Sequence, residues 1–251
     1  MIPVFTFFAV DKGNMTLVQF SNGINMLIDC RCSPLRPSPL EYLKPKVKTL
    51  DFVVITHPHQ DHLTGLKDLC QHYMPKYLWH NGRYFRPDPV YDDWSYYEAL
   101  RNGQHSYCTP TAVRAGQTAS IGQAKLHILG PKIPYLEGTS EDENNNSLML
   151  KITEGLSSIV LTGDTQGEQW DTIDGNALVG TTALLASHHG RESGFSERAL
   201  RIMQPQLVII SDGESCDTDV THDYAEFALV KTTRNGSLVV QPQTSVAATF
   251  A

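Results

Sequence analysis

The sequence predicts a mixed α/β fold in which two sheets pack together and helices cover their outer faces. Apolar runs of strand length recur along the whole chain, and stretches with helical spacing separate them in both halves. The 251 residues suffice for one large layered domain with a substantial core. Strands and helices in two similar halves favour paired sheets with helices outside. We therefore interpret residues 1–251 as a single domain.

The first half contains most of the clear strand signals. Apolar alternation predicts strands over 4–10, 16–20 and 25–29, and Asn22-Gly23 is a hairpin signal between the last two. A loop rich in proline follows over 31–46, with a short helix at 40–43. The next elements expected are a buried strand over 51–56, a helix from Leu63 to Tyr73 and a strand at 77–80.

Residues 81–110 differ in character, because aromatic residues crowd there beside Arg83, Arg86 and Arg101. We predict an insertion near the mouth of the site, with a short helix at 95–101. Its aromatic rings could stack on bases or on an apolar substrate. They could equally pack the insertion onto the main fold, which is the usual role of irregularly spaced aromatic residues.

The second half repeats the strand and helix signals. The polar segment 137–146 is expected to be a loop, and Ser196 is an N-cap signal for a helix that stops before Pro205. The strands predicted here cover residues 125–129, 147–153, 158–162, 183–187, 207–211, 237–241 and 246–250, and the helices cover 196–203 and 222–230.

Composition narrows the function classes. The net charge of −7 argues against a broad basic surface for nucleic acid but leaves room for a local basic groove. The longest apolar runs are of strand length, so no membrane span is expected, and residues 1–10 lack the basic start of a leader. Five cysteines at irregular spacing favour free thiols and a cytoplasmic protein.

The segment His57-Pro58-His59-Gln60-Asp61-His62 follows the strand predicted at 51–56. It places three imidazoles and a carboxylate within six residues at a strand tip. Imidazole nitrogen and carboxylate oxygen suit Zn²⁺, Mn²⁺ or Fe. The segment therefore predicts a metal site.

Three more strands predicted downstream end in residues that can bind metal or move protons. They end in Thr162-Gly163-Asp164, in Ser187-His188-His189-Gly190 and in Ser211-Asp212, with His222 in the following loop. A lone Thr-Gly-Asp is usually a turn, but these endings in this order after the histidine cluster predict one shared metal centre.

With these motifs, the chain resembles the metallo-β-lactamase superfamily. Within it, the chain is most similar to the hydrolase-like domain of bacterial DNA-uptake (competence) proteins. The residues that carry the subgroup likeness are Phe8 to Asn14, Asn22-Gly23 with Leu27 to Asp29, Asn145 to Leu148, Leu161 to Asp164 and Ser187 to Gly190. The resemblance implies a four-layer αββα sandwich with the metal site at one edge of the paired sheets.

The resemblance also implies roles for individual residues. His57 and His59 would bind one metal, and Asp61 and His62 a second. Asp164 would bridge the two ions, and His188 would complete the second position. Two divalent ions, Zn or Mn, would share a hydroxide that attacks a phosphoryl or acyl group. Asp61 would also orient the water, while His222 would donate a proton or hold a phosphate.

One departure concerns the first metal position. The fuller family pattern has a further histidine before the strand that leads to Asp164, where this chain has Glu143-Asn144-Asn145-Asn146-Ser147. An asparagine carbonyl from 144–146 or a water would fill that place. We therefore expect weaker binding of one ion, with a preference for Mn²⁺. Arg191, His189 and Asn146 are predicted to contact the substrate.

The favoured function is a metal-dependent phosphodiesterase, a nuclease acting on DNA. One alternative is a hydrolase of a small molecule such as a lactone, a thioester or a cyclic nucleotide. Another is a subunit of an effector complex that needs a partner protein. The charge of −7 favours a partner or a small substrate over unaided binding of long nucleic acid. The sequence does not predict the oligomeric state.

Overall fold

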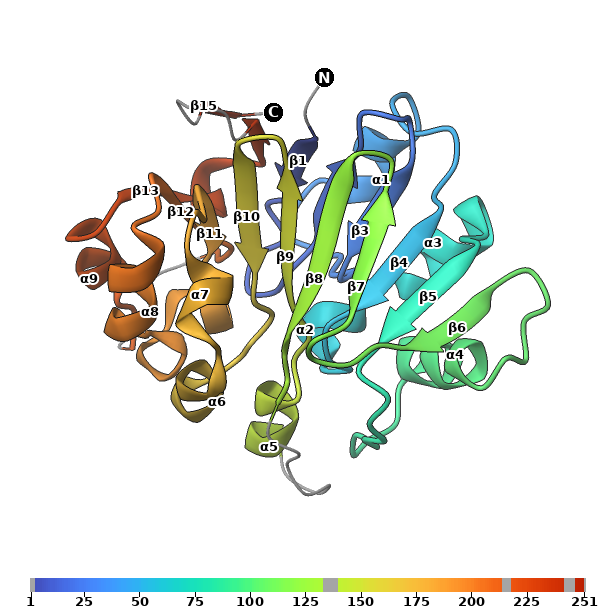
Figure 1. The fold of residues 1–251 in the computed structure, drawn as a ribbon. Helices are drawn as coiled ribbons and strands as arrows, with labels where there is room; N and C mark the ends of the chain where they lie inside the picture. Colours follow the sequence, from blue (N-terminus) through green and yellow to red (C-terminus); the bar gives the residue numbers. More distant parts are fainter. Residues whose placement is uncertain (1–2, 133–139, 214–217, 242–246, 251) are drawn as a thin grey trace.

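The computed structural model describes residues 3–132, 140–213, 218–241 and 247–250, which form two mixed sheets packed face to face (Figure 1). The strand order is β15-β14-β1-β2-β3-β4-β5-β6 in the first sheet and β13-β12-β11-β10-β9-β8-β7 in the second. The strands are β1 (Val4–Phe7), β2 (Thr16–Gln19), β3 (Asn25–Ile28), β4 (Phe52–Ile55), β5 (Tyr77–His80), β6 (Thr109–Ala112), β7 (Thr118–Ile121), β8 (Ala124–Gly130), β9 (Met149–Glu154), β10 (Ser157–Leu161), β11 (Ala183–Leu185), β12 (Leu207–Ile210), β13 (Leu229–Thr232), β14 (Leu238–Gln241) and β15 (Ala247–Phe250).

Each sheet contains a parallel run beside antiparallel strands. In the first sheet, β3, β4, β5 and β6 are parallel neighbours. In the second, β10, β11, β12 and β13 are parallel. The carboxyl ends of parallel neighbours meet at one edge of a sheet, so the polar segments that follow β10, β11 and β12 come together there.

Alternation along the strands produces the layers. Val54 of β4 faces the core between the sheets, whereas its neighbours Val53 and Ile55 face the outer core of the first sheet. In β10 of the second sheet, Ile159 and Leu161 face inward between the sheets. Since successive strand residues point to opposite faces, apolar residues at every position indicate that both faces of these strands are covered.

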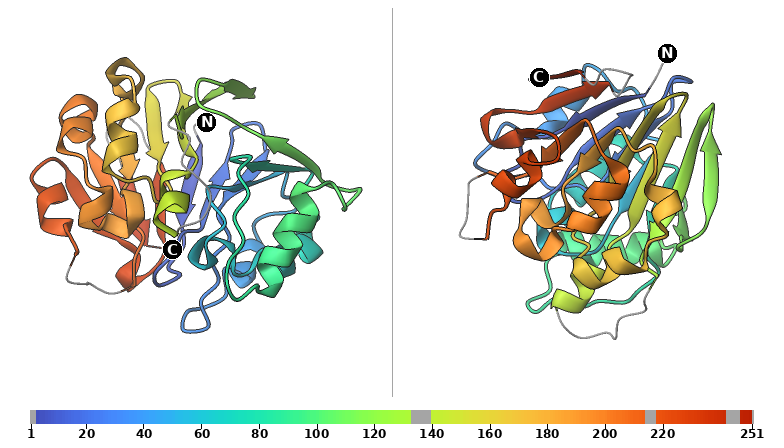
Figure 2. Two further views of the ribbon diagram at one scale, coloured as in Figure 1. Left: turned by 90° about the horizontal axis from the view of Figure 1, so that it is seen from below. Right: turned by 60° about the vertical axis from the view of Figure 1, so that its left-hand side comes forward.

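Helices supply the two outer layers, which Figure 2 shows on either side of the paired sheets. Apolar residues of the helices over the first sheet join its outer core, and those over the second sheet join another. The helices over the first sheet are α1 (Pro39–Leu43), α3 (Leu66–Tyr73) and α4 (Asp92–Arg101), and those over the second are α6 (Gly167–Thr172), α7 (Gly175–Leu178), α8 (Glu197–Met203) and α9 (Thr221–Ala225). The predicted αββα sandwich is confirmed.

Short elements lie where the sheets open at one end of the molecule. Helices α2 (Gln60–Leu63) and α5 (Ser140–Asn145) lie at this end (Figure 1). The 3₁₀ turns are η1 (Ser187–Gly190), η2 (Glu192–Gly194) and η3 (Thr233–Asn235).

Two predicted elements were wrong. The helix expected at 222–230 ends at Ala225, because Leu229 and Val230 begin β13, which pairs with β12. The loop expected at 137–146 contains α5, while residues 137–139 lie outside the described residues. Strands β6 and β7 and helices α6 and α7 were not predicted, because their short polar sequences carry weak periodicity.

The aromatic residues of 81–110 mainly pack this region onto the first sheet. Trp94 and Tyr97 of α4 are buried in the outer core, and the Trp94 indole N–H donates to the carbonyl of Phe85. Tyr84 is exposed instead, and the Phe85 ring meets the His59 ring edge-on with 5.3 Å between centroids. Packing thus accounts for these helix aromatics, and the loop before α4 borders the histidine cluster.

Two composition-based expectations can be compared with the structure. None of the helices in the described residues is long and apolar enough to cross a membrane. Cys30, Cys32, Cys70 and Cys108 are free, as expected for thiols outside a disulfide framework, and Cys216 lies outside the described residues.

Candidate metal centre

The histidine cluster follows β4 directly and turns into helix α2. His57 and His62 are fully buried, while His59 and Asp61 are partly exposed. The amides of His62 and Leu63 both donate to the His59 carbonyl, which closes the turn. The strand tip and the single helical turn therefore direct all four side chains toward one end of the sandwich.

Asp164 approaches the cluster from the second sheet, three residues after β10. The chain turns at Gly163, whose φ is +53°. A Cβ there would lie 2.9 Å from Ser147 and Thr56 atoms, so the close approach requires glycine. The Asp164 amide donates to Ser147 Oγ at 3.0 Å, and the carboxylate is 2% exposed. The Thr-Gly-Asp motif thus places a buried carboxylate between the two sheets.

His188 and His189 occupy consecutive left-handed positions, with φ of 50° and 58°. Such conformations are strained for residues other than glycine and cluster at functional sites. His189 Nδ1 donates to the Ser211 carbonyl at 3.1 Å, which directs Nε2 toward Asp164. His188 Nδ1 pairs with Ser193 Oγ at 2.6 Å. The two neighbouring rings therefore have different partners, with His189 Nε2 facing Asp164 and His188 Nδ1 facing Ser193.

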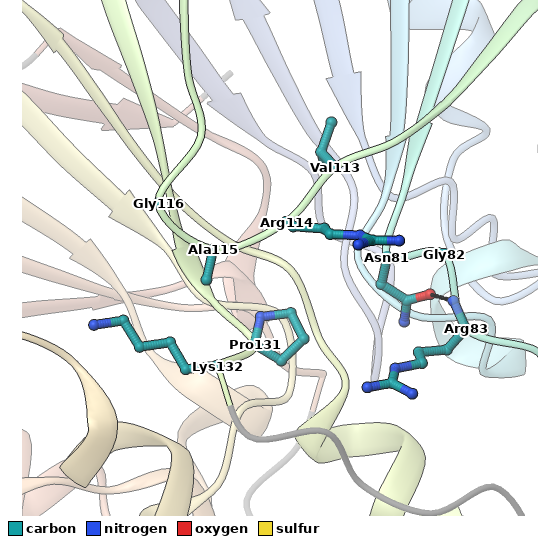
Figure 3. Close-up of a pocket in the computed structure, with 9 residues that line it drawn as sticks. All are labelled: Asn81, Gly82, Arg83, Val113, Arg114, Ala115, Gly116, Pro131 and Lys132. Carbon is teal, nitrogen blue, oxygen red and sulfur yellow. Dashed lines mark hydrogen bonds between the residues drawn. The ribbon is translucent and has the colours of Figure 1, made fainter.

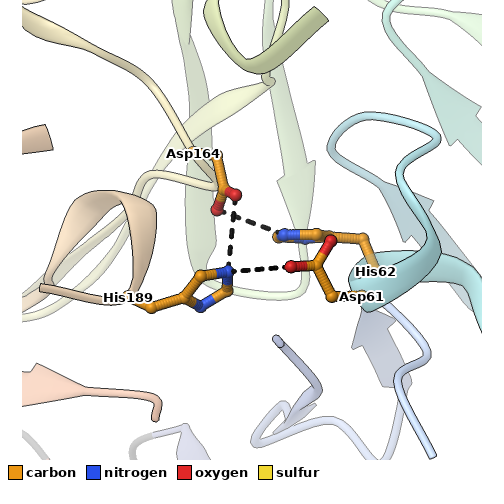
Figure 4. A group of neighbouring side chains, drawn as sticks. All are labelled: Asp61, His62, Asp164 and His189. Atoms are coloured by element: carbon orange, nitrogen blue, oxygen red, sulfur yellow. Dashed lines mark ion pairs between the residues drawn. The ribbon is translucent and has the colours of Figure 1, made fainter. Parts of the chain in front are cut away.

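Asp61, His62, Asp164 and His189 converge on one point, as Figure 4 shows. One potential ligand atom from each lies within 4.8 Å of those from the other three. His62 Nε2 is 3.1 Å from Asp164 Oδ1, and His189 Nε2 is 3.4 Å from Asp164 Oδ2 and 3.6 Å from Asp61 Oδ2. We call these four residues the second metal position.

His57 and His59 converge beside them, and His57 also faces Asp164. His57 Nε2 lies 3.0 Å from His59 Nδ1 and 3.8 Å from Asp164 Oδ2. We call His57, His59 and the shared Asp164 the first metal position. Since Zn–N bonds are about 2.0–2.1 Å long, nitrogen atoms at this separation can contact one ion.

The buried polar atoms show that the site fits a metal. His62 Nε2, His189 Nε2 and Asp164 Oδ1 are buried and make no hydrogen bond to the described residues. Orphaned buried groups of this kind are rare and point to a missing ion or water. Two imidazole nitrogens and two carboxylates are a donor set that Zn²⁺ or Mn²⁺ accepts.

A second layer of hydrogen bonds orients the ligands. Asp29 Oδ2 accepts from His62 Nδ1 at 2.7 Å, and Asp29 also accepts from the Thr56 amide and hydroxyl. Thr56 Oγ1 and Ser147 Oγ lie 3.2 Å and 3.1 Å from His57 Nδ1. Carboxylates that hold a histidine ligand in this way raise its basicity and fix its tautomer.

The charges of the site are coupled through Asp164. Burial disfavours the charged form of His62, but the Asp164 and Asp29 carboxylates outweigh it and raise its pKa well above the ordinary value. Burial likewise opposes the charge on His189, but Asp164 and Asp61 raise its pKa to about 9. Burial lowers the pKa of His57 well below its usual value. A metal at the second position would therefore displace protons from two imidazoles.

The geometry favours a different division of roles between His188 and His189 from the expected one. His188 was predicted to complete the second position and His189 to contact substrate. The structure places His189 Nε2 in the second position, while His188 lines the pocket with its Nε2 3.9 Å from Asp164 Oδ2. The Ser211 carbonyl, which directly follows β12 and is 22 residues further along the chain, holds the His189 ring in this orientation.

The remaining predicted substrate contacts fall in different places. Arg191 lines a cavity of about 520 Å³ next to Asp61 and Asp164, together with Lys12, whose Nζ is 3.4 Å from Asp61 Oδ2. Asn146 is 1% exposed and does not line that cavity, because its amide donates to Glu143 and its carbonyl accepts from Asn81.

Asn144, rather than Asn146, reaches the site. It lines the same cavity, lies beside His59, and has a buried Oδ1 with no partner among the described residues. His222 is exposed on α9 and is absent from the cavity lining, so the described contacts give its predicted proton-transfer role no support.

Sequence reasoning gave no role in the site to Asp29, Ser147 and Ser211. Asp29 lies in the hairpin stretch that carried the family likeness. It directly follows a strand and has a left-handed backbone with φ of 57°. Its position at a strand end is the signal in the sequence that could have indicated a role. Ser147 and Ser211 act through contacts with residues 90 and 22 positions away, which no local pattern encodes.

Comparison with known proteins places this centre in a family. The model of the metallo-beta-lactamase superfamily matches residues 9–210. ComE operon protein 3 of Bacillus subtilis is 27% identical over 171 residues, which is 67% of this chain and 21% of that protein. Anti-Pycsar protein Apyc1 of Bacillus phage vB_BsuM-Goe3 is 45% identical over 57 residues, 23% of this chain and 21% of that protein. The chain thus spans about a fifth of the length of these relatives.

A solved structure shows the same fold. The metallo-beta-lactamase fold protein YhfI from Bacillus subtilis matches with a TM-score of 0.61 and 12% identity, over 98% of this chain and 100% of that one. At this identity the likeness concerns the fold alone, while the similarity to ComE operon protein 3 supports the competence-protein subgroup.

Proposed function

The chain belongs to the metallo-β-lactamase superfamily of metal-dependent hydrolases, and on that premise we propose that it is a phosphodiesterase that cleaves DNA. The observation that carries the proposal is the position of Asp164. His62 faces one of its oxygens, and His57, His188 and His189 face the other. A buried carboxylate that has the imidazoles of both metal positions around it is suited to contact two divalent ions, Zn or Mn.

The residues divide between the two ions. Asp61, His62 and His189 would hold one ion with Asp164, and His57 and His59 would hold the other with Asp164. Asn144 Oδ1, which lacks a partner among the described residues, would complete the first position. When bound, two ions about 3.5–4 Å apart supply Lewis acidity toward a phosphoryl oxygen and an ionised water near pH 7.

The protein's own groups position the substrate. Lys12 and Arg191 line the cavity beside Asp61 and Asp164, and both can pair with the non-bridging oxygens of a phosphodiester. Arg191 is held by its backbone, since its amide donates to the His188 carbonyl and its residue bridges to Asp219. Asp61, at the border of cavity and metal position, would orient the attacking water.

The net charge of −7 disfavours DNA binding over the whole surface, but the charge around the cavity is what the scissile phosphate would encounter. Metal ions would neutralise the buried carboxylates, and the cations that line the cavity are those that the phosphate meets. The likeness to competence proteins favours DNA as the substrate. The cavity of about 520 Å³ also suits a small phosphodiester, so this class is the second candidate.

The test is cleavage of plasmid and single-stranded DNA with added Mn²⁺, Zn²⁺ or Mg²⁺, beside a colourless-to-yellow small diester, bis(p-nitrophenyl) phosphate. We expect metal-dependent cutting that Asp164→Ala abolishes and that Asp92→Ala, on the exposed start of α4, leaves intact. If metal-loaded protein hydrolyses the small diester but no DNA, the second candidate replaces the first. If it hydrolyses neither, the phosphodiesterase proposal is wrong.

A further inference from the structure

A second cavity, of about 770 Å³, lies outside the metal centre and carries positive charge (Figure 3). We call it the basic pocket, and it is lined by Arg83, Arg114 and Lys132 together with Asn81. Arg83 follows β5 of the first sheet, Arg114 lies between β6 and β7, and Lys132 follows β8 of the second. The pocket therefore opens where the edges of the two sheets join.

The two arginines of this pocket form no close ion pair among the side chains that the structure describes, although the charge of Arg83 acts on the Glu143 carboxyl. Neither Arg83 nor Arg114 has a carboxylate oxygen within 4.0 Å in that part of the molecule. The nearby Glu143 is buried and bound by the amides of Asn81 and Asn146, and burial raises its pKa to about 7. In a chain of net charge −7, unpaired arginines gathered in one cavity indicate an anionic ligand.

The arrangement in the pocket favours phosphate. In Figure 3 the Arg83 and Arg114 side chains lie on either side of Asn81, and Lys132 stands at the opposite wall with its amine directed away from them. Guanidinium groups present planar forks of N–H donors that match phosphate oxygens. We therefore expect the two arginines to make the main contacts and Lys132 to contribute less.

Two chain links connect the basic pocket to the metal centre. Asn81 donates to the Asn146 carbonyl at 2.9 Å, and Asn144, two residues earlier, lines the cavity at the metals. Arg83 is two residues from Phe85, whose ring contacts His59. Two residues span at most about 7 Å, so the separation of the two sites corresponds to a few nucleotides of an extended strand.

We propose that the basic pocket binds a backbone phosphate a few nucleotides away from the bond that is cleaved, so that the substrate is an oligonucleotide strand rather than a mononucleotide or cyclic nucleotide. This inference rests on the proposed phosphodiesterase function and names its substrate class. The strand passes Phe85 and the 143–146 segment, and its scissile phosphate lies between Lys12 and Arg191.

The test measures binding without turnover. Fluorescein-labelled dT12 with a phosphorothioate backbone resists cleavage and keeps its charges, whereas the methylphosphonate form of dT12 is neutral. Fluorescence anisotropy with metal-loaded protein should show tighter binding of the charged form. Arg83→Gln with Arg114→Gln should weaken that binding by about tenfold or more, since two charge-assisted contacts are lost. The slope of log Kd against log salt should fall by about 1.

Controls separate the pocket from general charge loss. Arg201→Gln removes an exposed arginine of α8 that pairs with Glu197, on the helix layer of the second sheet, and should not change the affinity. Lys132→Gln should have a smaller effect than either arginine change. Unchanged dT12 binding in the double variant, or an equal loss with Arg201→Gln, would overturn the inference.

Kinetics distinguish this inference from the proposed function. The double variant should raise KM for cleavable dT12 and leave hydrolysis of bis(p-nitrophenyl) phosphate unchanged, because only the longer substrate reaches the basic pocket. Binding of dT12 through the arginines without any DNA cleavage would support the pocket and refute the nuclease. DNA cleavage with an unchanged KM in the double variant would support the nuclease and refute the pocket.

Discussion

The two metal positions differ in how many protein groups each offers to an ion. The second metal position has four protein groups, and hydrogen bonds from Asp29 and the Ser211 carbonyl fix two of its imidazoles. The first position has His57, His59 and a share of Asp164. Among the described residues, the Asn144 side-chain carbonyl is the further group that this position can use.

In the proposed two-ion centre, the missing family histidine would weaken the first position and leave the second intact. The second position draws ligands from both sheets and fixes two of its rings, so it should bind metal first and tightly. The first metal position should bind its ion last and exchange it readily with solution.

The largest effect is expected from Asp164→Ala, because it removes the one ligand that both positions share. Since loss of a group that merely orients a metal ligand costs about 10–100-fold, loss of the bridge should reduce activity by more than about 100-fold. Native mass spectrometry should show fewer than two ions per chain. Two tightly held ions in this variant would show that Asp164 is no bridge.

The next largest effect is expected from replacing His189 and His188 one at a time. His189→Ala should remove the tightly bound ion, whereas His188→Ala should leave it in place, because only His189 Nε2 belongs to the second position. Cobalt-substituted protein allows each loss to be followed by visible absorption, independent of activity. A stronger loss from His188→Ala would restore the assignment expected from the sequence.

Asp29→Asn tests the support of the second position. The asparagine keeps the size of the side chain but removes the charge that holds His62 Nδ1. Metal affinity at the second position should fall by about 10–100-fold, with little change at the first. Titration with a competing chelator measures both. Equal weakening of the two positions would mean that Asp29 acts on the fold and not on His62.

Asn144→Ala should weaken only the first position, and by a smaller amount. A single neutral carbonyl is lost there, while His57 and His59 remain. A shift of a few fold in the Mn²⁺ concentration for half-maximal activity is expected, with the tightly bound ion retained. If Asn144→Ala leaves the Mn²⁺ dependence unchanged, water completes the first position.

His80 belongs to neither metal position, and its protonation should make the folding stability depend on pH. Burial, and then Arg101, lower the pKa of His80 to about 4, from an unfolded value of 6.5. The folded state thus resists protonation, so stability is full above pH 6.5 and is lost as pH falls toward 4. Between pH 7 and pH 5 the loss should be about 2 kcal/mol. Thermal unfolding at several pH values should show that the stability of His80→Gln falls less steeply as the pH is lowered. An unchanged dependence of stability on pH would assign the loss to the metal ligands.

Local sequence patterns predicted most of the fold. Short runs rich in aromatic and apolar residues gave strands such as 77–80 at their observed bounds, because such residues favour a strand with at least one buried face. The patterns failed where tertiary pairing decided the element. Leu229 and Val230 continue a helical pattern, yet pairing with Leu207 and Val208 makes them a strand.

The sequence by itself determined the chemistry of the site, because the ligand types and the strand that precedes each are local properties. His57, His59, Asp61, His62 and Asp164 follow from motifs at strand ends. Only the tertiary structure decided which imidazole of His188 and His189 faces the metals. Adjacent residues differ by a ring orientation that the Ser211 carbonyl sets. The same holds for the basic pocket, whose arginines are 31 positions apart in the chain and line one cavity because they follow the paired strands β5 and β6.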